Sequence, residues 1–178
     1  MEHKIIIAGF GGQGILSAGK MLAYAGMLEN KSVSWLPSYG PEMRGGTANC
    51  NVIITDEQVG SPIVNDATVL IAMNTPSLEK YEKCVQPGGA IILDSSLVNK
   101  EVTRKDVTVY CIPATELASQ AGNNAFANIY LLGKLIAHTQ VIEPESFELS
   151  LTHTLKEKYH HMIPEEMKIL REGMEYKQ

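Results

Sequence analysis

Short apolar runs alternate with amphipathic segments through the first two thirds of the chain. Continuous apolar runs are typical of buried strands, whereas apolar positions three or four residues apart indicate helices. We expect strands at residues 4–8, 32–36, 48–55, 67–73, 90–93 and 107–112. Helices are expected at 15–28 and 75–85, and then at 115–120, 125–139, 143–158 and 164–176. This order predicts one α/β domain over residues 1–178, with a mainly parallel central sheet, flanking helices and a helical C-terminal third.

The first predicted helix has small residues at four positions, Ala18, Gly19, Ala23 and Gly26. Because small side chains let a helix approach its neighbours closely, we expect this helix to pack tightly on the sheet. The run Thr75-Pro76-Ser77 combines a capping side chain with a proline in the first turn, and we place the start of the second helix there. We expect Pro87-Gly88-Gly89 to end this helix.

Composition narrows the function classes. The formal net charge is −5, and the sequence shows no basic face that could neutralise phosphates. Both observations argue against a dedicated nucleic-acid-binding protein. We find no apolar stretch near the ~20 residues that a bilayer span needs. The N-terminus enters a strand without the pattern of a signal peptide, so we expect a cytoplasmic protein.

Cysteine spacing argues against metal chemistry within this chain. Cys50, Cys84 and Cys111 are odd in number and far apart, without a CxxC pair. We therefore expect neither a disulfide framework nor a cysteine-ligated cluster, and interpret the three as small, partly buried side chains. His160-His161 could attract a metal ion, but surface histidines are the simpler interpretation because no further ligand lies at suitable spacing.

The run Gly9-Phe10-Gly11-Gly12-Gln13-Gly14 joins the first predicted strand to the first helix. In a Rossmann-like sheet, glycines at this place allow a tight turn, and the N–H groups at the helix start favour an anion. We predict that a ligand such as a phosphate-bearing cofactor binds at Gly9, Gly11, Gly12, Gln13 and Gly14. The alternative is a tight crossover without a ligand.

Two absences limit the class of nucleotide. No lysine follows Gly14, so the loop is not a P-loop of nucleotide hydrolysis. The second predicted strand lacks the terminal acid that holds the ribose of NAD or FAD, which argues against these dinucleotides. Gln13 could instead exchange hydrogen bonds with an amide or a carbonyl group.

A second glycine-rich loop follows the second predicted strand. Arg44 offers a planar, bidentate donor for carboxylate or phosphate, and Glu42 could orient it or reach a partner chain. A surface turn with an ordinary Glu–Arg pair is the alternative. We predict contacts with substrate or with a neighbouring subunit, and the candidate residues are Ser38, Tyr39, Gly40, Glu42, Met43, Arg44, Gly45 and Gly46.

These loops resemble those of a known family, the gamma subunits of 2-oxoacid:ferredoxin oxidoreductases. The resemblance is carried by residues 9–14, by Ser38 to Asn49 and by Gln86-Pro87-Gly88-Gly89, and it extends to a helical stretch from Asn128 to Gly133. The form with Met43 and Thr47-Ala48-Asn49 is more similar to 2-oxoglutarate and branched-chain 2-oxoacid members than to pyruvate or indolepyruvate members.

The resemblance implies one subunit of a larger enzyme. Such enzymes oxidatively decarboxylate a 2-oxoacid with coenzyme A, giving acyl-CoA, carbon dioxide and reduced ferredoxin. It further implies alpha, beta and ferredoxin-like delta subunits as partners, which hold thiamine diphosphate, Mg²⁺ and iron–sulfur clusters. This chain would contribute to coenzyme A binding and to closing the active site, without a catalytic residue of its own. The isolated chain could pair as a homodimer.

Two other function classes stay open from the sequence. The chain could be a stand-alone nucleotide-binding or regulatory module, because the missing acid does not exclude every nucleotide. It could also be a structural scaffold subunit, which predicts no ligand at the glycine loop.

Overall fold

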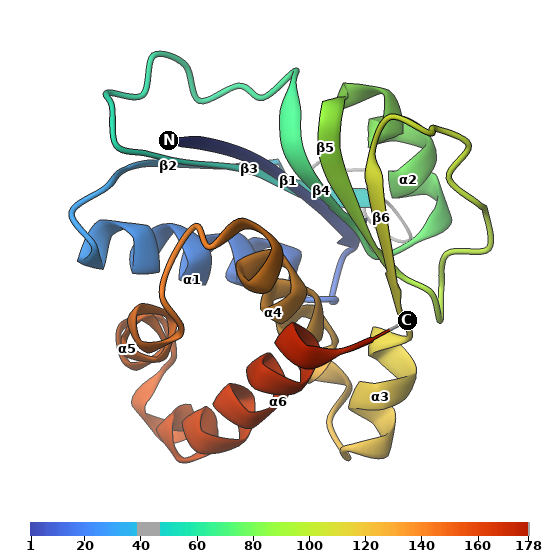
Figure 1. The fold of residues 1–178 in the computed structure, drawn as a ribbon. Coiled ribbons are helices and arrows are strands. Elements are labelled where there is room, and N and C mark those ends of the chain that lie inside the picture. The colour runs from blue at the N-terminus through green and yellow to red at the C-terminus, as the bar shows by residue number, and fades with distance from the viewer. Residues whose placement is uncertain (39–46, 178) are drawn as a thin grey trace.

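The computed structural model describes residues 1–38 and 47–177 (Figure 1). The strands are β1 (Glu2–Phe10), β2 (Ser32–Ser38), β3 (Thr47–Thr55), β4 (Ala67–Ala72), β5 (Val85–Asp94) and β6 (Thr108–Ile112). The helices are α1 (Ile15–Leu28), α2 (Thr75–Tyr81), α3 (Ala114–Gln120), α4 (Ala127–Thr139), α5 (Pro144–Thr154) and α6 (Ile163–Glu175). Short 3₁₀ segments cover Glu82–Cys84, Asn124–Phe126 and Glu157–Met162. The prediction of an α/β fold with a helical C-terminal part is confirmed.

The strands form one sheet in the order β2-β3-β1-β4-β5-β6. The pairs β1/β4, β4/β5 and β5/β6 are parallel, whereas β3 runs antiparallel to both of its neighbours. The predicted mainly parallel sheet is therefore confirmed among the described strands. The hairpin β2–β3 places β3 between β1 and β2, so β2 does not pair with the strand that leads into the glycine loop.

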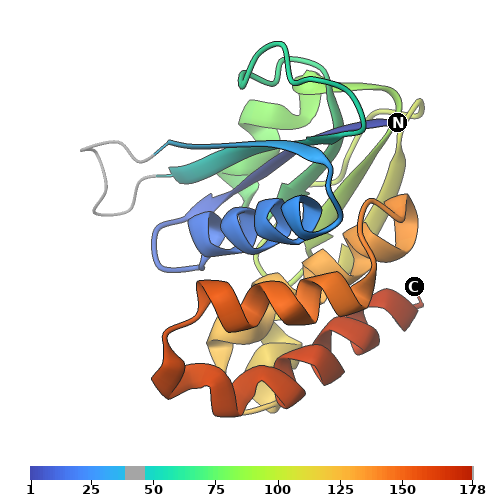
Figure 2. The same ribbon diagram turned by 90° about the vertical axis from the view of Figure 1, so that its left-hand side faces the viewer.

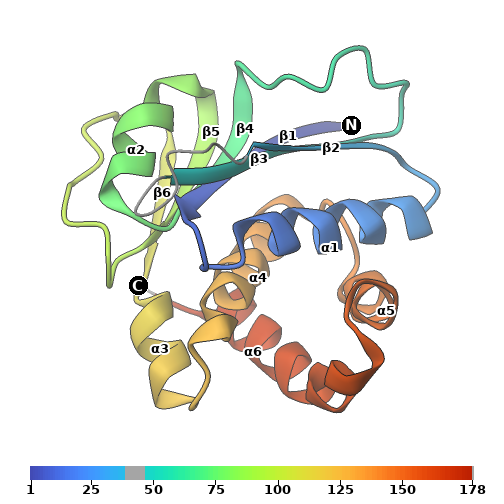
Figure 3. The same ribbon diagram turned by 180° about the vertical axis from the view of Figure 1, so that it is seen from behind.

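Both faces of the central strands are covered, as their continuous apolar runs predict. In β1, Ile5 and Ile7 point to one core, while Ile6 and Ala8 point to the other. Helices α1 and α4 lie against the first face, and α5 and α6 pack on these two helices (Figure 2). Helix α2 lies on the opposite face (Figure 3). No helix of the described residues is long and apolar enough to cross a membrane.

Helix α1 packs closely on the sheet through its small residues, as predicted. A Cβ atom at Gly19 would collide with the Cys50 sulfur, and one at Gly26 would lie 2.9 Å from Val33 Cγ1. Ala18 and Ala23 are buried on the same helix. The small residues are therefore needed because side chains of β2 and β3 occupy the space beside them.

Helices α4 and α6 touch backbone to backbone. A Cβ atom at Gly133 would collide with the Leu170 carbonyl oxygen and lie 2.9 Å from the Met174 nitrogen. On the facing helix, a Cβ atom at Gly173 would collide with the Tyr130 carbonyl oxygen. Two glycines at one crossing thus fix how closely α6 approaches α4.

Several predicted boundaries were wrong. The cap of α2 is Asn74, whose side-chain oxygen accepts a hydrogen bond from the Ser77 N–H at 2.8 Å, so Thr75 is already helical. Pro87-Gly88-Gly89 does not end a helix but lies inside β5. There the pairing with β4 is irregular, since Ala67 pairs with Val85 and Val69 with Ala90. Helix α5 ends at Thr154, short of the predicted residue 158.

Replacing Gly133 with alanine should destabilise the protein. The new methyl group has to push α6 away, and overpacking of this kind costs about 1–3 kcal/mol, which exceeds the ~1 kcal/mol that alanine gains over glycine in a helix. Urea unfolding of the full chain measures the difference. Gly60→Ala is the matched control, because a Cβ atom there has no neighbour within 4 Å and the backbone is not left-handed. Equal stability of the two variants would contradict the close helix contact.

Glu166 of α6 should make stability depend on pH. Its side chain is buried, its Oε2 has no hydrogen-bond partner among the described residues, and burial raises its pKa to about 7. The unfolded chain has a glutamate pKa of about 4.3, so the folded state holds the proton more tightly. The free energy of unfolding should therefore fall as pH rises from about 4.5 through 7.

Glu166→Gln should remove this loss, because glutamine carries no charge at any of these pH values. We expect the variant to be more stable than the parent by about 1–3 kcal/mol at pH 8, with a much smaller difference at pH 4.5. Urea titrations at several pH values measure it, with the exposed neighbour Glu165→Gln as control. A stability difference that does not change with pH would refute the assignment.

Candidate functional site

The glycine loop leaves the carboxyl end of β1 and enters α1. Gly12 has φ +89° and Gly14 has φ +72°, so both positions need a residue that adopts the left-handed region easily. Helix α1 after β1 and helix α2 after β4 lie on opposite faces of the sheet (Figure 1). In open α/β sheets, ligands bind outside the carboxyl ends of two neighbouring strands whose following helices lie on opposite faces.

Gln13 closes the glycine loop with its own side chain. Its Oε1 accepts a hydrogen bond from the Phe10 N–H at 2.6 Å, and its Nε2 donates to the Met73 carbonyl oxygen at 3.3 Å. Gly9 leaves room for this arrangement, since a Cβ atom there would lie 2.5 Å from Gln13 Oε1. The amide thus joins the ends of β1 and β4, and its direct contact with a ligand stays a prediction.

A side chain from the C-terminal part of the chain holds the other end of the loop. Asn128, near the start of α4, donates from Nδ2 to the Gly14 carbonyl oxygen at 3.1 Å. The sequence analysis included Asn128 in the family resemblance but predicted no role for it, because no local pattern reveals a contact between residues 114 positions apart.

Two hollows flank the glycine loop and share Gly12. The first, of about 300 Å³, is lined by Phe10, Gly11, Gly12, Gly14, Ile15, Leu16, Ser17 and Ala48. The second, of about 220 Å³, is lined by Gly12, Gln13, Met73, Leu97, Thr115, Asn124, Ala125 and Ala127. Four of the five predicted glycine-loop residues therefore line a hollow, and Gly9 lies behind them.

The first hollow lies at the start of α1 and favours negative charge. The first N–H groups of a helix have no partner within the helix, and α1 has neither a side-chain cap nor an acidic residue in its first turn. The 14-residue helix adds the positive end of its dipole. No charged side chain is among the lining residues, so backbone N–H groups and the exposed Ser17 are the donors available to an anion.

The second predicted loop begins and ends at the same edge of the sheet. Ser38, at the end of β2, pairs with Asn49, and Thr47 pairs with Phe10 directly before the glycine loop. Ser38 is exposed. The other candidates lie outside the described residues; they are Tyr39, Gly40, Glu42, Met43, Arg44, Gly45 and Gly46.

A buried carboxylate that sequence reasoning missed shapes the wall of the second hollow. Asp94, at the end of β5, is fully buried and accepts hydrogen bonds from the Thr115 hydroxyl at 2.5 Å and the Ser96 N–H at 3.1 Å. It thereby fixes the segments that carry Thr115 and Leu97. Its place at the end of a strand could have marked Asp94 as a candidate, but its partner Thr115 lies 21 residues further along the chain.

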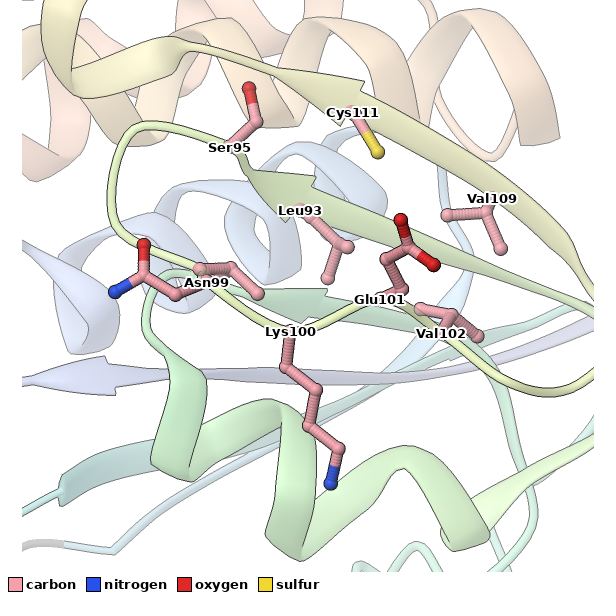
Figure 4. A pocket seen from close by; sticks show the side chains of 9 residues that line it. Leu93, Ser95, Asn99, Lys100, Glu101, Val102, Val109 and Cys111 are labelled. Carbon is pink, nitrogen blue, oxygen red and sulfur yellow. The ribbon is translucent and has the colours of Figure 1, made fainter.

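Larger hollows lie away from the glycine loop. One of about 450 Å³ lies over the ends of β5 and β6, where the Cys111 thiol and the Glu101 carboxylate point into it (Figure 4). Lys100 points away, toward Glu79 of α2, with 3.3 Å between Nζ and Oε1. Another, of about 780 Å³, lies between α4, α5 and α6. Neither has a glycine-rich turn, and the start of α5 that lines the second carries the acidic residues Glu143 and Glu145, which disfavour an anion.

The cysteines differ in burial. Cys50 is buried, and burial raises the pKa of its thiol to about 12, so the thiolate is strongly disfavoured. Cys84 is partly buried, but Cys111 is exposed, which corrects the expectation for that residue. Among the described residues, no group of three His, Cys, Asp or Glu side chains is arranged to hold a metal ion.

Curated relatives of this chain are subunits of 2-oxoacid oxidoreductases. Ketoisovalerate oxidoreductase subunit VorA of Methanothermobacter thermautotrophicus is 40% identical over an alignment of 178 positions, which covers 98% of this chain. The chain spans only 36% of the length of that relative. 2-Oxoglutarate synthase subunit KorC of Methanocaldococcus jannaschii is 37% identical over 154 residues, covering 85% of this chain and 82% of the relative.

Two solved structures share the fold. The gamma subunit of a keto/oxoacid ferredoxin oxidoreductase from Geobacter sulfurreducens matches with a TM-score of 0.84 and 27% identity, over 98% of this chain and 95% of that one. The 2-oxoglutarate:ferredoxin oxidoreductase from Magnetococcus marinus, with 2-oxoglutarate, coenzyme A and succinyl-CoA bound, matches with a TM-score of 0.86 and 23% identity. That match covers 97% of this chain and 30% of the larger one.

The family model of pyruvate ferredoxin/flavodoxin oxidoreductases matches residues 4–176, which include the glycine loop, the sheet and the C-terminal helices. The sequence-based resemblance to this family is thereby confirmed. The chain belongs to the pyruvate ferredoxin/flavodoxin oxidoreductase family.

Proposed function

We propose that this chain is the gamma subunit of a multisubunit 2-oxoacid:ferredoxin oxidoreductase. The enzyme would convert a 2-oxoacid, coenzyme A and oxidised ferredoxin to acyl-CoA, carbon dioxide and reduced ferredoxin. The relatives VorA and KorC and the Geobacter gamma subunit support this assignment over a stand-alone nucleotide-binding module. Their names point to a branched-chain 2-oxoacid or 2-oxoglutarate as the substrate.

Within that enzyme, the glycine loop would bind the phosphate groups of coenzyme A. The observation that carries this proposal is the uncapped start of α1, which faces a hollow of about 300 Å³ without an acidic lining residue. Coenzyme A is a polyanion, and the start of a helix is a suitable anion site. The Magnetococcus enzyme, which shares the fold, holds coenzyme A.

The second glycine-rich loop would contribute to the same site or to the subunit contact around it. Its neighbours in sequence, Ser38 and Thr47, lie at the edge of the sheet where the glycine loop lies. Arg44 would supply the bidentate charge that the first hollow lacks. The loop and the hollow together would orient the thioester carrier and exclude water from the reacting centre.

The redox and decarboxylation chemistry would lie in other subunits. We propose alpha, beta and ferredoxin-like delta subunits as partners, in a cytoplasmic complex that reduces ferredoxin. Thiamine diphosphate with Mg²⁺ and the iron–sulfur clusters would belong to these partners and would supply carbanion stabilisation and electron transfer. This chain's own contribution would be binding and orientation of coenzyme A.

Ser17→Asp tests the anion site at the start of α1. A carboxylate in the first turn should stabilise the helix slightly, by about 0.3–1 kcal/mol, yet repel an anion in the hollow. In the assembled complex we expect the KM for coenzyme A to rise about tenfold while thermal stability holds or increases. Ser17→Asn, which keeps the size without the charge, is the control. A KM unchanged by the aspartate would remove coenzyme A from this hollow.

Arg44→Ala separates ligand binding from assembly in the second loop. If Arg44 pairs with coenzyme A, its loss should raise the KM for coenzyme A about tenfold or lower kcat. Decarboxylation of the 2-oxoacid at the thiamine centre should stay largely intact, since that step precedes the transfer to coenzyme A. Steady-state kinetics with a viologen dye as electron acceptor measure the KM for coenzyme A and kcat. Unchanged coenzyme A kinetics with a complex that dissociates would make the loop an assembly element.

A further inference from the structure

Asn128 lies almost fully buried behind the glycine loop, with 6% of its surface exposed. Its Nδ2 donates to the Gly14 carbonyl oxygen at 3.1 Å, and the same oxygen accepts the first helical hydrogen bond, from the Ala18 N–H at 2.9 Å. One carbonyl group at the start of α1 thus receives two donors. Because the second donor belongs to α4, the position of the loop depends on a helix far away in sequence.

The space around Gly14 is shaped to this contact. A Cβ atom at Gly14 would lie 2.5 Å from Asn128 Nδ2, so any larger residue would displace the amide. The residue is also left-handed, with φ +72°. Gly14 therefore combines an unusual backbone conformation with a close approach to Asn128, and the two together fix where the loop ends.

The helix that carries Asn128 is itself held firmly. Gly133, five residues further along α4, is the point where α6 touches the backbone of α4. Tyr130, between the two, donates from its hydroxyl group to Glu172 of α6 at 3.0 Å. Asn128 thus acts from a support that the C-terminal layer fixes, not from a loose surface segment.

Half of the Asn128 amide has no partner. Its Oδ1 is buried without a hydrogen-bond partner among the described residues, which costs free energy. An apolar side chain of similar size would avoid that cost if packing were the residue's whole contribution. The Nδ2 group of the same amide holds the glycine loop, so we infer that the contribution of Asn128 is this contact.

We propose that Asn128 is a positioning residue for coenzyme A, which rests on the function proposed above. By holding the Gly14 carbonyl group it keeps the first N–H groups of α1 in place at the first hollow, which Gly14, Ile15, Leu16 and Ser17 line. Asn128 does not touch the ligand itself, because it is not among the residues that line either hollow. The C-terminal helical layer thereby sets the affinity of a site formed by the N-terminal loop.

The test compares Asn128→Ala and Asn128→Asp in the assembled complex. Alanine removes the donor, and aspartate places an oxygen opposite the Gly14 carbonyl oxygen, so aspartate should be the more severe change. Hydrogen exchange of the peptide covering residues 9–18 should become faster in both. The KM for coenzyme A should rise about 5–20-fold with kcat changed less than about twofold, because only the binding geometry is disturbed.

Ser150→Ala is the matched control for a general loss of stability. The Ser150 hydroxyl group is fully buried in α5 and donates to the Phe147 carbonyl oxygen at 2.7 Å, away from the loop. It should leave both exchange at 9–18 and the KM for coenzyme A unchanged. Asn128 variants that behave like this control would overturn the inference.

The two proposals fail in different ways. If the Asn128 variants leave the KM unchanged while Ser17→Asp raises it, the inference is wrong and the coenzyme A site stands. If hydrogen exchange of the glycine loop becomes faster but no variant changes the KM for coenzyme A, Asn128 does fix the loop. Coenzyme A is then not the ligand of the loop.

Discussion

The structure depends on how the backbone crosses from β1 to α1 beside the end of β4. At this crossing the chain turns through two left-handed glycines, and a polar side chain replaces the sheet hydrogen bonds that end there. Gln13 joins Phe10 to Met73 through its two amide atoms, at 2.6 and 3.3 Å. The apolar strands on either side make this crossing rigid, because Ala8 and Met73 are fully buried beneath it.

The same crossing explains why the site requires the whole fold. The loop comes from the first residues of the chain, yet Asn128 of α4 fixes its last carbonyl group, and α6 in turn fixes α4. Two close contacts transmit this arrangement, that of Gly14 with the Asn128 side chain and that of Gly133 with the backbone of α6. The proposed anion site therefore depends on long-range packing, although its donors are local.

The pattern of apolar and polar residues predicted helices and strands well where local and long-range interactions favour the same structure. The run Ile5 to Ala8 had to be a covered strand, and the small residues of α1 had to face the sheet. Pattern failed where a distant partner decides. The antiparallel insertion of β3 between β1 and β2 follows from a hairpin, and apolar runs do not show strand direction. Pro87-Gly88-Gly89 was predicted to end a helix, but the irregular pairing with β4 accommodates these residues within β5.

The site shows the same division. The glycine loop was found from residue types alone, because left-handed turns and free N–H groups need glycine at given places. Asn128 and Asp94 were missed, since each contacts a residue at least 21 positions away, Gly14 and Thr115 respectively, and neither stands out in its own segment. In the second loop, Arg44 and Glu42 lie outside the described residues, and their roles rest on the chemistry of their side chains.

The most direct measurement is a structure of the assembled complex with coenzyme A bound. The account predicts phosphate oxygens within about 2.7–3.2 Å of backbone nitrogens in residues 11–17, with Gln13 still joining Phe10 to Met73. Phosphate groups bound elsewhere, with the start of α1 covered by a partner side chain, would contradict it.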